Sequence, residues 1–282
     1  MLKLCKDFKW TPKNNDDFVK LVSEFIIQTN DYKANLNWIN TSKITNMSEL
    51  FAKSFRHDKI DLHKFNGDIS KWDVHNVTNM SRMFYHSDFE GDISNWDVSS
   101  AENMENMFAY SKFNGDISKW NVSNVENMCC MFSKCENLIG DISKWDVHNV
   151  TNMCGMFQYG KFLNNADISN WNVSNVKNMS SMFAHSKFNG DISNWNVSSV
   201  TNMESMFYHA NFNKDISNWD VSNVINMKQM FAYSPFNKDI SNWNVQKNVS
   251  VHQMFSDSLF KGDISNWNIS DKQKKLAYEQ II

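Results

Sequence analysis

The sequence predicts an α/β repeat solenoid, a stack of copies of about 24 residues that each hold one short parallel strand and one short helix or 3-10 turn. Three observations predict this fold: a pentapeptide that recurs nine times, a fixed set of apolar positions in each copy, and an apolar stripe near each terminus. A single copy cannot cover its own apolar face, so the core closes only when neighbouring copies stack.

The pentapeptide Asp-Ile-Ser-x-Trp marks the start of each copy. It begins at Asp68, Asp92, Asp116, Asp141, Asp167, Asp191, Asp215, Asp239 and Asp263, in steps of 24 to 26 residues. A degenerate copy with Trp38 and Phe51 precedes them. We therefore expect an N-terminal capping segment with an amphipathic helix over residues 1–33, a solenoid over 34–269 whose last copy is partial, and a C-terminal capping helix over 270–282.

Positions within a copy are numbered here from its first Asp, which is position 0. Trp at position 4 and Val at position 6 alternate with period two, which is typical of a short strand with one buried face. In the first copy Met80, Met83 and Phe84 lie at i, i+3 and i+4, which predicts a short helix or 3-10 turn. A Phe or Leu, such as Leu138, closes the copy.

Both ends need a cover, because a bare solenoid end exposes its core. Residues 15–28 predict an amphipathic capping helix with Phe18, Leu21 and Phe25 on its apolar side. Residues 270–282 predict a short helix with Leu276, Ile281 and Ile282. Apolar stripes of this kind can also bind partner helices, but capping is the simpler interpretation.

Stacking places equal positions of successive copies side by side. The Asn residues at position 11 then form a structural ladder that satisfies backbone groups at a corner, with an Asn-lined ligand site as the alternative. They are Asn79, Asn103, Asn127, Asn152, Asn178, Asn202 and Asn226. The Asp residues at position 0 would repel one another unless each binds the N–H two residues on, as in an Asx-turn. Calcium along these carboxylates is the alternative.

The composition excludes several classes of protein. The chain has 282 residues, of which 41% are hydrophobic and 21% charged, so we expect a core and no wholesale disorder. Its 28 Lys and Arg against 31 Asp and Glu lack the basic excess of a nucleic-acid binder. No apolar run is long enough to insert into a membrane. The first residues, up to Cys5, show no export signal or lipid-attachment site, which favours the cytoplasm.

The repeat resembles that of BspA-like leucine-rich-repeat surface proteins. The run Ile-x-x-Trp-x-Val has the form L-x-x-L-x-L, and Phe132 with Cys135 is similar to the Ala-Phe-x-x-Cys motif of that branch, with Met131 in place of Ala. Residues 188–203 read like one such repeat, which also occurs in mycoplasma lipoproteins of unknown function. The resemblance covers residues 35–270 and implies a right-handed stack with a non-enzymatic role in adhesion or protein binding, often at a bacterial surface.

Two surfaces are candidates for partner binding. The polar strand face carries lysines at position 3, namely Lys71, Lys119 and Lys144. A stripe at positions 17 and 18 carries Tyr85, His86, Tyr110, Tyr159, His185, Tyr208, His209 and Tyr233. Rows of Tyr and His are more typical of interfaces than Lys, Glu or Ser. The alternative for the stripe is that it only covers a convex turn.

We find no catalytic constellation, and we expect no enzyme activity, no cofactor and no metal. His185 and His209 would stack in adjacent copies, but nothing supplies the other ligands of a zinc ion. Cys129 and Cys154 share position 13 beside Cys130, and these thiols could form a disulfide or bind a soft metal. Five cysteines at these spacings predict reduced thiols, with Cys135 packed in the core.

The sequence therefore predicts a non-enzymatic binding module. We expect a protein partner, with a host or cell-surface protein as one candidate, and no nucleic acid. The alternative is a structural protein that associates with itself and has no dedicated ligand. An enzyme would rest on the His and Cys columns alone.

Overall fold

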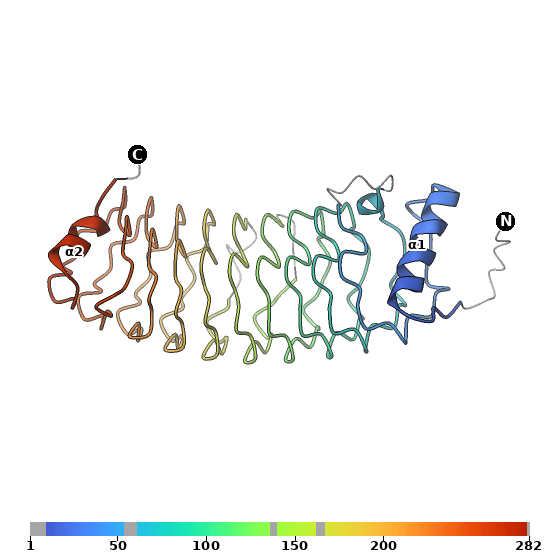
Figure 1. Cartoon of the computed structure of the whole chain (residues 1–282), viewed down its shortest axis with the longest axis horizontal. Coiled ribbons are helices and arrows are strands. Elements are labelled where there is room, and N and C mark those ends of the chain that lie inside the picture. Colours follow the sequence, from blue (N-terminus) through green and yellow to red (C-terminus); the bar gives the residue numbers. More distant parts are fainter. Residues whose placement is uncertain (1–9, 54–60, 136–139, 162–166, 281–282) are drawn as a thin grey trace.

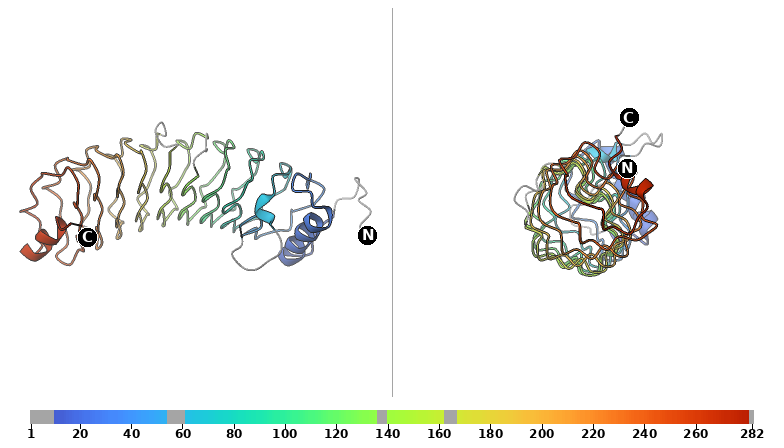
Figure 2. Two further views of the ribbon diagram at one scale, coloured as in Figure 1. Left: turned by 90° about the horizontal axis from the view of Figure 1, so that it is seen from above. Right: turned by 90° about the vertical axis from the view of Figure 1, so that its left-hand side faces the viewer.

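The computed structural model describes residues 10–53, 61–135, 140–161 and 167–280. Similar coils of chain follow one another along a single axis (Figure 1), and the whole stack is curved (Figure 2). Three helices are present in these residues: α1 (Asn15–Thr29), the 3-10 helix η1 (Leu62–Lys64) and α2 (Asp271–Ala277). Cys5, Leu138, Ile281 and Ile282 lie outside the described residues.

Parallel backbone pairing joins each coil to the next at position 11. The paired residues run without a break from Asn46 through Asn79, Asn103, Asn127, Asn152, Asn178, Asn202 and Asn226 to Ser250. On the C-terminal side of each Asn, every second N–H donates to a carbonyl of the following coil. In the first copy these N–H groups belong to Met80, Arg82, Phe84 and His86, with N–O distances of 2.7 to 3.0 Å. We call this backbone pairing the ladder.

The ladder lies elsewhere in the repeat than expected. The sequence places a strand at Trp-x-Val, whereas eight of the ten described bridges lie at position 11, and the other two, Trp10 with Ile39 and Asn35 with Asp68, lie at the N-terminal end. The reason is that amides near the tryptophan are used within their own coil: Trp72 N–H donates to the Ile69 carbonyl at 3.1 Å, and Val77 N–H to the Val74 carbonyl at 2.9 Å. An amide that closes a local turn is not available to pair with the neighbouring coil.

The Met-x-x-Met-Phe segment forms consecutive turns where the sequence predicts a short helix or 3-10 turn. Met83 N–H donates to the Met80 carbonyl at 3.2 Å and Tyr85 N–H to the Arg82 carbonyl at 3.0 Å, both with i to i+3 spacing. Arg82 and His86 adopt the left-handed conformation, with φ of 56° and 54°. Left-handed residues interrupt a right-handed helix, so the remaining amides are free to donate across the ladder.

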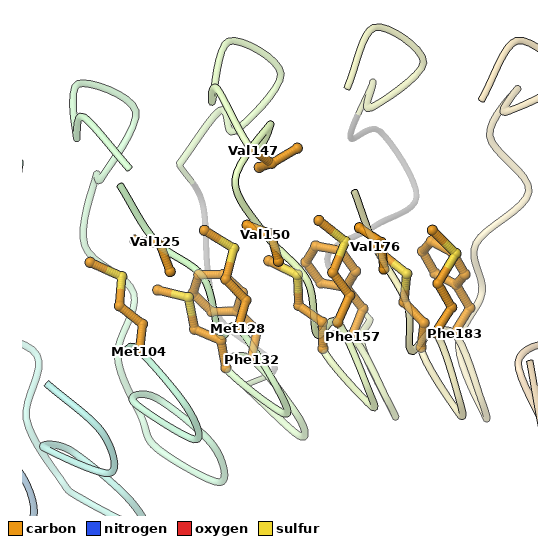
Figure 3. Close-up of a cluster of buried hydrophobic side chains, with 14 of the residues drawn as sticks. Met104, Val125, Met128, Phe132, Val147, Val150, Phe157, Val176 and Phe183 are labelled. Carbon is orange, nitrogen blue, oxygen red and sulfur yellow. The ribbon is translucent and has the colours of Figure 1, made fainter. Parts of the chain in front are cut away.

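Aromatic side chains fill the interior as stacked columns. The Phe residues at position 16 stack from Phe84 to Phe255, and neighbouring ring centroids are 5.6 to 6.1 Å apart. Figure 3 shows Phe132, Phe157 and Phe183 of this column beside Met104 and Met128. Each indole N–H at position 4 also has a partner, since Trp96 Nε1 donates to the Ile69 carbonyl at 3.2 Å and the other copies repeat the contact.

Helices α1 and α2 lie at the two ends of the stack (Figure 1). α1 begins after Asn14, whose side chain accepts the Asp17 N–H, and its Phe18 packs edge-on against Trp72 at 5.3 Å. α2 begins with a capping box between Ser270 and Gln273. In the described residues, α1 buries Phe18, Leu21, Val22 and Ile26 in the core, and α2 buries Ala277.

Candidate functional site: an aromatic column beside the ladder

The side chains at position 18 form one continuous column along the ladder. Their order is His86, Tyr110, Lys134, Tyr159, His185, His209 and Tyr233. The stacked ring pairs of this column have centroid distances of 4.3 to 5.0 Å and interplanar angles of 6° to 12°. We call this set the aromatic column. It contains six of the residues that the sequence singles out in the Tyr and His stripe.

Lys134 joins the two halves of the aromatic column. Its Nζ lies 5.2 Å from the ring centroid of Tyr110 and 4.9 Å from that of Tyr159, so the ammonium group lies between two π faces. Lys134 was not among the residues expected in the Tyr and His stripe. Its place at position 18 could have revealed it, because the residues at one position of successive copies stack whatever their type.

The two tyrosines at position 17 extend the aromatic column sideways. Tyr85 packs edge-on against Tyr110 with a centroid distance of 6.0 Å, and Tyr208 packs against Tyr233 at 5.7 Å. Arg82 also lies over the Tyr85 ring at 4.6 Å. The structure thus gathers all eight Tyr and His residues of the expected stripe on one face.

Every member of the aromatic column has a left-handed backbone, with φ between 53° and 60°. This conformation costs a residue other than glycine roughly 1–2 kcal/mol, and Asn tolerates it better than Tyr or His. Stacking returns about 0.5–1.5 kcal/mol per aromatic pair. Stacking therefore roughly offsets the backbone cost but gives no reason to prefer rings to Asn, which this chain uses at many other turns.

The aromatic column presents ring edges to solvent. Ring faces are occupied by the neighbouring rings, while Tyr110 remains 39% exposed and His209 is exposed. Burial lowers the pKa of His86, with nearby lysines adding to the effect, and burial followed by the neighbouring His209 lowers the pKa of His185. These two imidazoles are therefore neutral at pH 7 and offer both a hydrogen-bond donor and an acceptor.

The ladder and the aromatic column lie on the inner side of the curved stack. Equivalent rings at position 18 are 4.3 to 5.0 Å apart, close to the ~4.8 Å between paired chains. Equivalent rings farther from the ladder are wider apart, such as Trp72 and Trp96 at 6.5 Å and Phe89 and Phe113 at 6.4 Å. The stripe is therefore not a cover of the convex side.

The lysines Lys71, Lys119 and Lys144 are exposed in the turn between the Asp and the Trp. This turn belongs to the wider side of the stack, on a segment of the coil separate from the aromatic column. Nearby, each Asp at position 0 accepts the N–H of the Ser two residues on, at 2.7 to 3.0 Å, which confirms the expected Asx-turns.

The seven asparagines at position 11, which the sequence predicts to form a structural ladder of side chains, are half-buried at a corner of each coil. The side chain of Asn79 accepts the Ser81 N–H at 2.9 Å, and the other six make the same contact with the residue at position 13. Each amide oxygen is thus used within its own coil. A second set of asparagines at position 8, which the sequence analysis missed, links coils: Asn124 Nδ2 donates to the Ser99 carbonyl at 2.7 Å.

The described residues contain no group of three or more His, Cys, Asp or Glu side chains placed to hold a metal ion. His185 and His209 lie in adjacent coils as expected. Their rings stack face to face, with the centroids 5.0 Å apart. The described cysteines Cys129, Cys130, Cys135 and Cys154 carry reduced thiols, and Cys135 is buried. In the part of the chain that the structure describes, no helix has the length and apolar character needed to cross a bilayer.

Comparison with known families identifies the repeat. The model of a family described as "Mycoplasma protein of unknown function, DUF285" matches five overlapping stretches, residues 9–114, 55–164, 109–211, 131–234 and 186–278. The chain belongs to this family. The overlapping matches span almost its whole length, which is the pattern of a repeat family. Comparisons with curated proteins and with solved structures gave no match.

Proposed function

We propose that this protein is a non-enzymatic binding module that recognises a protein partner along the aromatic column. One observation carries the proposal: six rings, with Lys134 between them, occupy a left-handed position over seven successive coils, although Asn would suit that backbone better and stacking only offsets the cost. Tyr is enriched at protein interfaces, where its ring and hydroxyl serve apolar and polar contacts together.

The mechanism would be multivalent recognition on a preorganised surface. Each ring edge offers a hydroxyl, an imidazole nitrogen or a short apolar border, and stacking holds the rings in place before the partner arrives. A side chain that is already ordered loses little further entropy on binding. An extended partner lying along the inner side could therefore add many weak contacts.

We further propose that the stack is a right-handed solenoid of BspA-like leucine-rich-repeat type, with the adhesion or protein-binding role that this resemblance implies. The motif of residues 188–203 and the period of about 24 residues support this assignment. The turn that carries Lys71, Lys119 and Lys144 is the second candidate surface, and the experiment below separates it from the aromatic column.

The test uses a variant that removes rings and places a residue that tolerates the left-handed backbone in their stead. Tyr208→Asn, His209→Asn and Tyr233→Asn together delete the C-terminal rings and keep a residue suited to the left-handed conformation at 209 and 233. A matched control, Ser205→Asn with Gln229→Asn, changes two left-handed residues at position 14 of the same two coils. Partners are captured by affinity from the cells that produce the protein and from their surroundings, and affinities are then measured by titration.

We expect the ring variant to bind the captured protein at least about ten-fold more weakly, which corresponds to roughly 1.4 kcal/mol, and the control to bind as the wild type does. A partner that binds both variants equally would contradict the aromatic column and point to the lysine-bearing turns. If sedimentation shows only self-association, the structural alternative holds. Because α1 and α2 cover both ends, such association would be side by side.

A further inference from the structure

Three thiols meet where two coils adjoin. Cys129 and Cys130 belong to one coil and Cys154 to the next, and Cys129 Sγ lies 3.7 Å from Cys130 Sγ. Cys130 N–H donates to the Cys154 carbonyl at 2.7 Å, so the backbones pair at this point. Equal positions of paired chains lie ~4.8 Å apart, which is within the Cα separation of roughly 4.4–6.8 Å that a disulfide spans.

Gly155 leaves room for one of these sulfur atoms. A Cβ atom at Gly155 would lie 2.8 Å from Cys130 Sγ, and the other copies all carry a side chain at this position. Gly155 also has a φ of 55°, like its counterparts. The missing side chain therefore lets the Cys130 thiol lie over the coil that contains Cys154.

The three thiols are within reach of small solutes. Cys129, Cys130 and Cys154 are each half-buried, whereas Cys135 is fully buried. Cys154 Sγ also receives a contact from Ser180 Oγ at 3.1 Å. A dissolved thiol reagent can therefore approach the cluster but not Cys135.

The contacts inside the cluster distinguish one thiol from the other two. Hydrogen bonds from Cys129, Cys130 and the Ser180 hydroxyl lower the pKa of Cys154. The contacts with Cys130 and Cys154 raise the pKa of Cys129. For Cys130 the contact with Cys129 lowers the pKa, but the contact with Cys154 and burial outweigh it and raise the pKa to about 11. Since the thiolate is the nucleophile, Cys154, which also accepts the Ser180 hydroxyl at 3.1 Å, is the candidate for the attacking thiol.

We propose that this cluster is a redox-responsive site, in which Cys154 and one thiol of the Cys129–Cys130 pair form a reversible disulfide between adjacent coils. The oxidant is a low-molecular-weight disulfide. The Cys154 thiolate attacks one of its sulfur atoms, its S–S bond breaks and one small thiolate leaves. The second protein thiol then loses its proton to water and attacks the Cys154 sulfur, which releases the other small thiol. Two protein thiols are oxidised and one small disulfide is reduced to two thiols.

The experiment incubates the full-length folded protein in glutathione disulfide, then alkylates remaining thiols and maps the peptides by mass spectrometry. We expect two of the five cysteines to escape alkylation, joined in a peptide that links Cys154 to Cys129 or Cys130. Dithiothreitol should restore both thiols. Cys154→Ser should abolish the link, whereas Cys135→Ser, whose thiol is outside the cluster, should retain it.

Serine is compatible with the fold at Cys154, because Ser81 and Ser180 occupy the same position in other copies. Circular dichroism confirms that each variant is folded, so a lost link reports on the thiol alone. The proposal is overturned if Cys154 stops at a mixed disulfide with glutathione, if the only bond joins Cys129 to Cys130, or if all five thiols remain alkylated.

Discussion

Each Asp at position 0 closes a turn with its own side chain. Asp191, Asp215 and Asp239 show the arrangement in successive coils, where one carboxylate oxygen accepts the N–H of the Ser two residues on. This N–H and then the Ser hydroxyl lower the pKa of each carboxyl group. The hydrogen bond thus offsets the repulsion that a column of stacked carboxylates would otherwise create.

These carboxylates should make the protein sensitive to acid. A carboxyl group whose pKa is lower in the folded state stabilises it above the ordinary carboxyl pKa of ~3.9, and this contribution is lost as the pH falls through the lower folded values. Asn keeps the acceptor oxygen but does not titrate. We therefore expect the triple variant Asp191→Asn, Asp215→Asn, Asp239→Asn to lose less of its melting temperature than the wild type between pH 5 and about pH 2.

Melting curves followed by circular dichroism across this pH range measure the effect. The control replaces the exposed residues at position 3 of the same copies, Asn194, Asn218 and Asn242, with Ser. It should keep the wild-type pH dependence. If the Asp variant and the wild type lose melting temperature in parallel, the Asx-turn carboxylates do not govern acid stability.

At the scale of elements, the ladder ends on a helix. Gln253 N–H donates to the Leu276 carbonyl at 2.7 Å, and Phe255 N–H donates to the Ala277 carbonyl at 2.8 Å. Helix α2 therefore satisfies amides that the last coil would leave open, besides covering its core. The seven-residue helix is too short to be stable alone, so its capping box matters.

Removal of the cap should loosen the end of the ladder. Ser270→Ala deletes the hydroxyl that accepts the Gln273 N–H at 3.3 Å. The loss of such a cap costs about 1 kcal/mol. We expect the amides of Gln253 and Phe255 to exchange with deuterium roughly five-fold faster. Lys272→Ala, an exposed change in the same helix, should leave these amides protected; equal rates in the two variants would show that the capping box does not support the ladder.

In the described residues, the backbone hydrogen bonds of each coil lie within that coil or join it to an adjacent one, which is the contact pattern of a one-dimensional array. Its curvature follows from unequal spacing: hydrogen bonds fix the ladder side at ~4.8 Å, while the rings opposite stand up to 6.5 Å apart. The closely spaced rings of the aromatic column therefore lie on the inner side, and the more widely spaced Trp rings lie on the outer side of the stack, whose curvature is visible in Figure 2. In such arrays stability is approximately a sum of local terms and contacts between neighbours.

A cavity in the middle of the stack should therefore open different coils from those that a cavity at its end opens. Phe157 stacks on Phe132 at 6.1 Å and on Phe183 at 5.9 Å, whereas Phe255 has one neighbouring coil and α2. Replacing a buried Phe with Ala costs about 3–5 kcal/mol. We expect Phe157→Ala to open the stack in its centre and Phe255→Ala to release only the C-terminal coil.

Hydrogen exchange followed by mass spectrometry distinguishes the two results. Phe157→Ala should lose protection in the coils on both sides of residue 157, while peptides near α1 and α2 stay protected. Phe255→Ala should lose it only after about residue 250. If both variants lose protection uniformly along the chain, the protein unfolds as one cooperative unit and not as an array.

The repeat period could be read completely from the amino-acid sequence. Equal spacing of Trp, Met and Phe defined the coils, the core and the stacked columns, because a column consists of whatever stands at one position. The apolar stripe at residues 15–28 likewise located α1 to within one residue, since the structure ends the helix at Thr29. The Asx-turns followed from Asp and the amide two residues on, which is local chemistry.

The route of the backbone within a coil depended on tertiary contacts. Met80 to Phe84 have helical spacing, yet their alternate amides pair with the next coil and left-handed residues break the helix. Periodicity cannot tell whether an amide bonds within its coil or across to its neighbour, because both arrangements bury the same side chains. That choice set the side of the ladder, hence the curvature, and with it the inner position of the aromatic column.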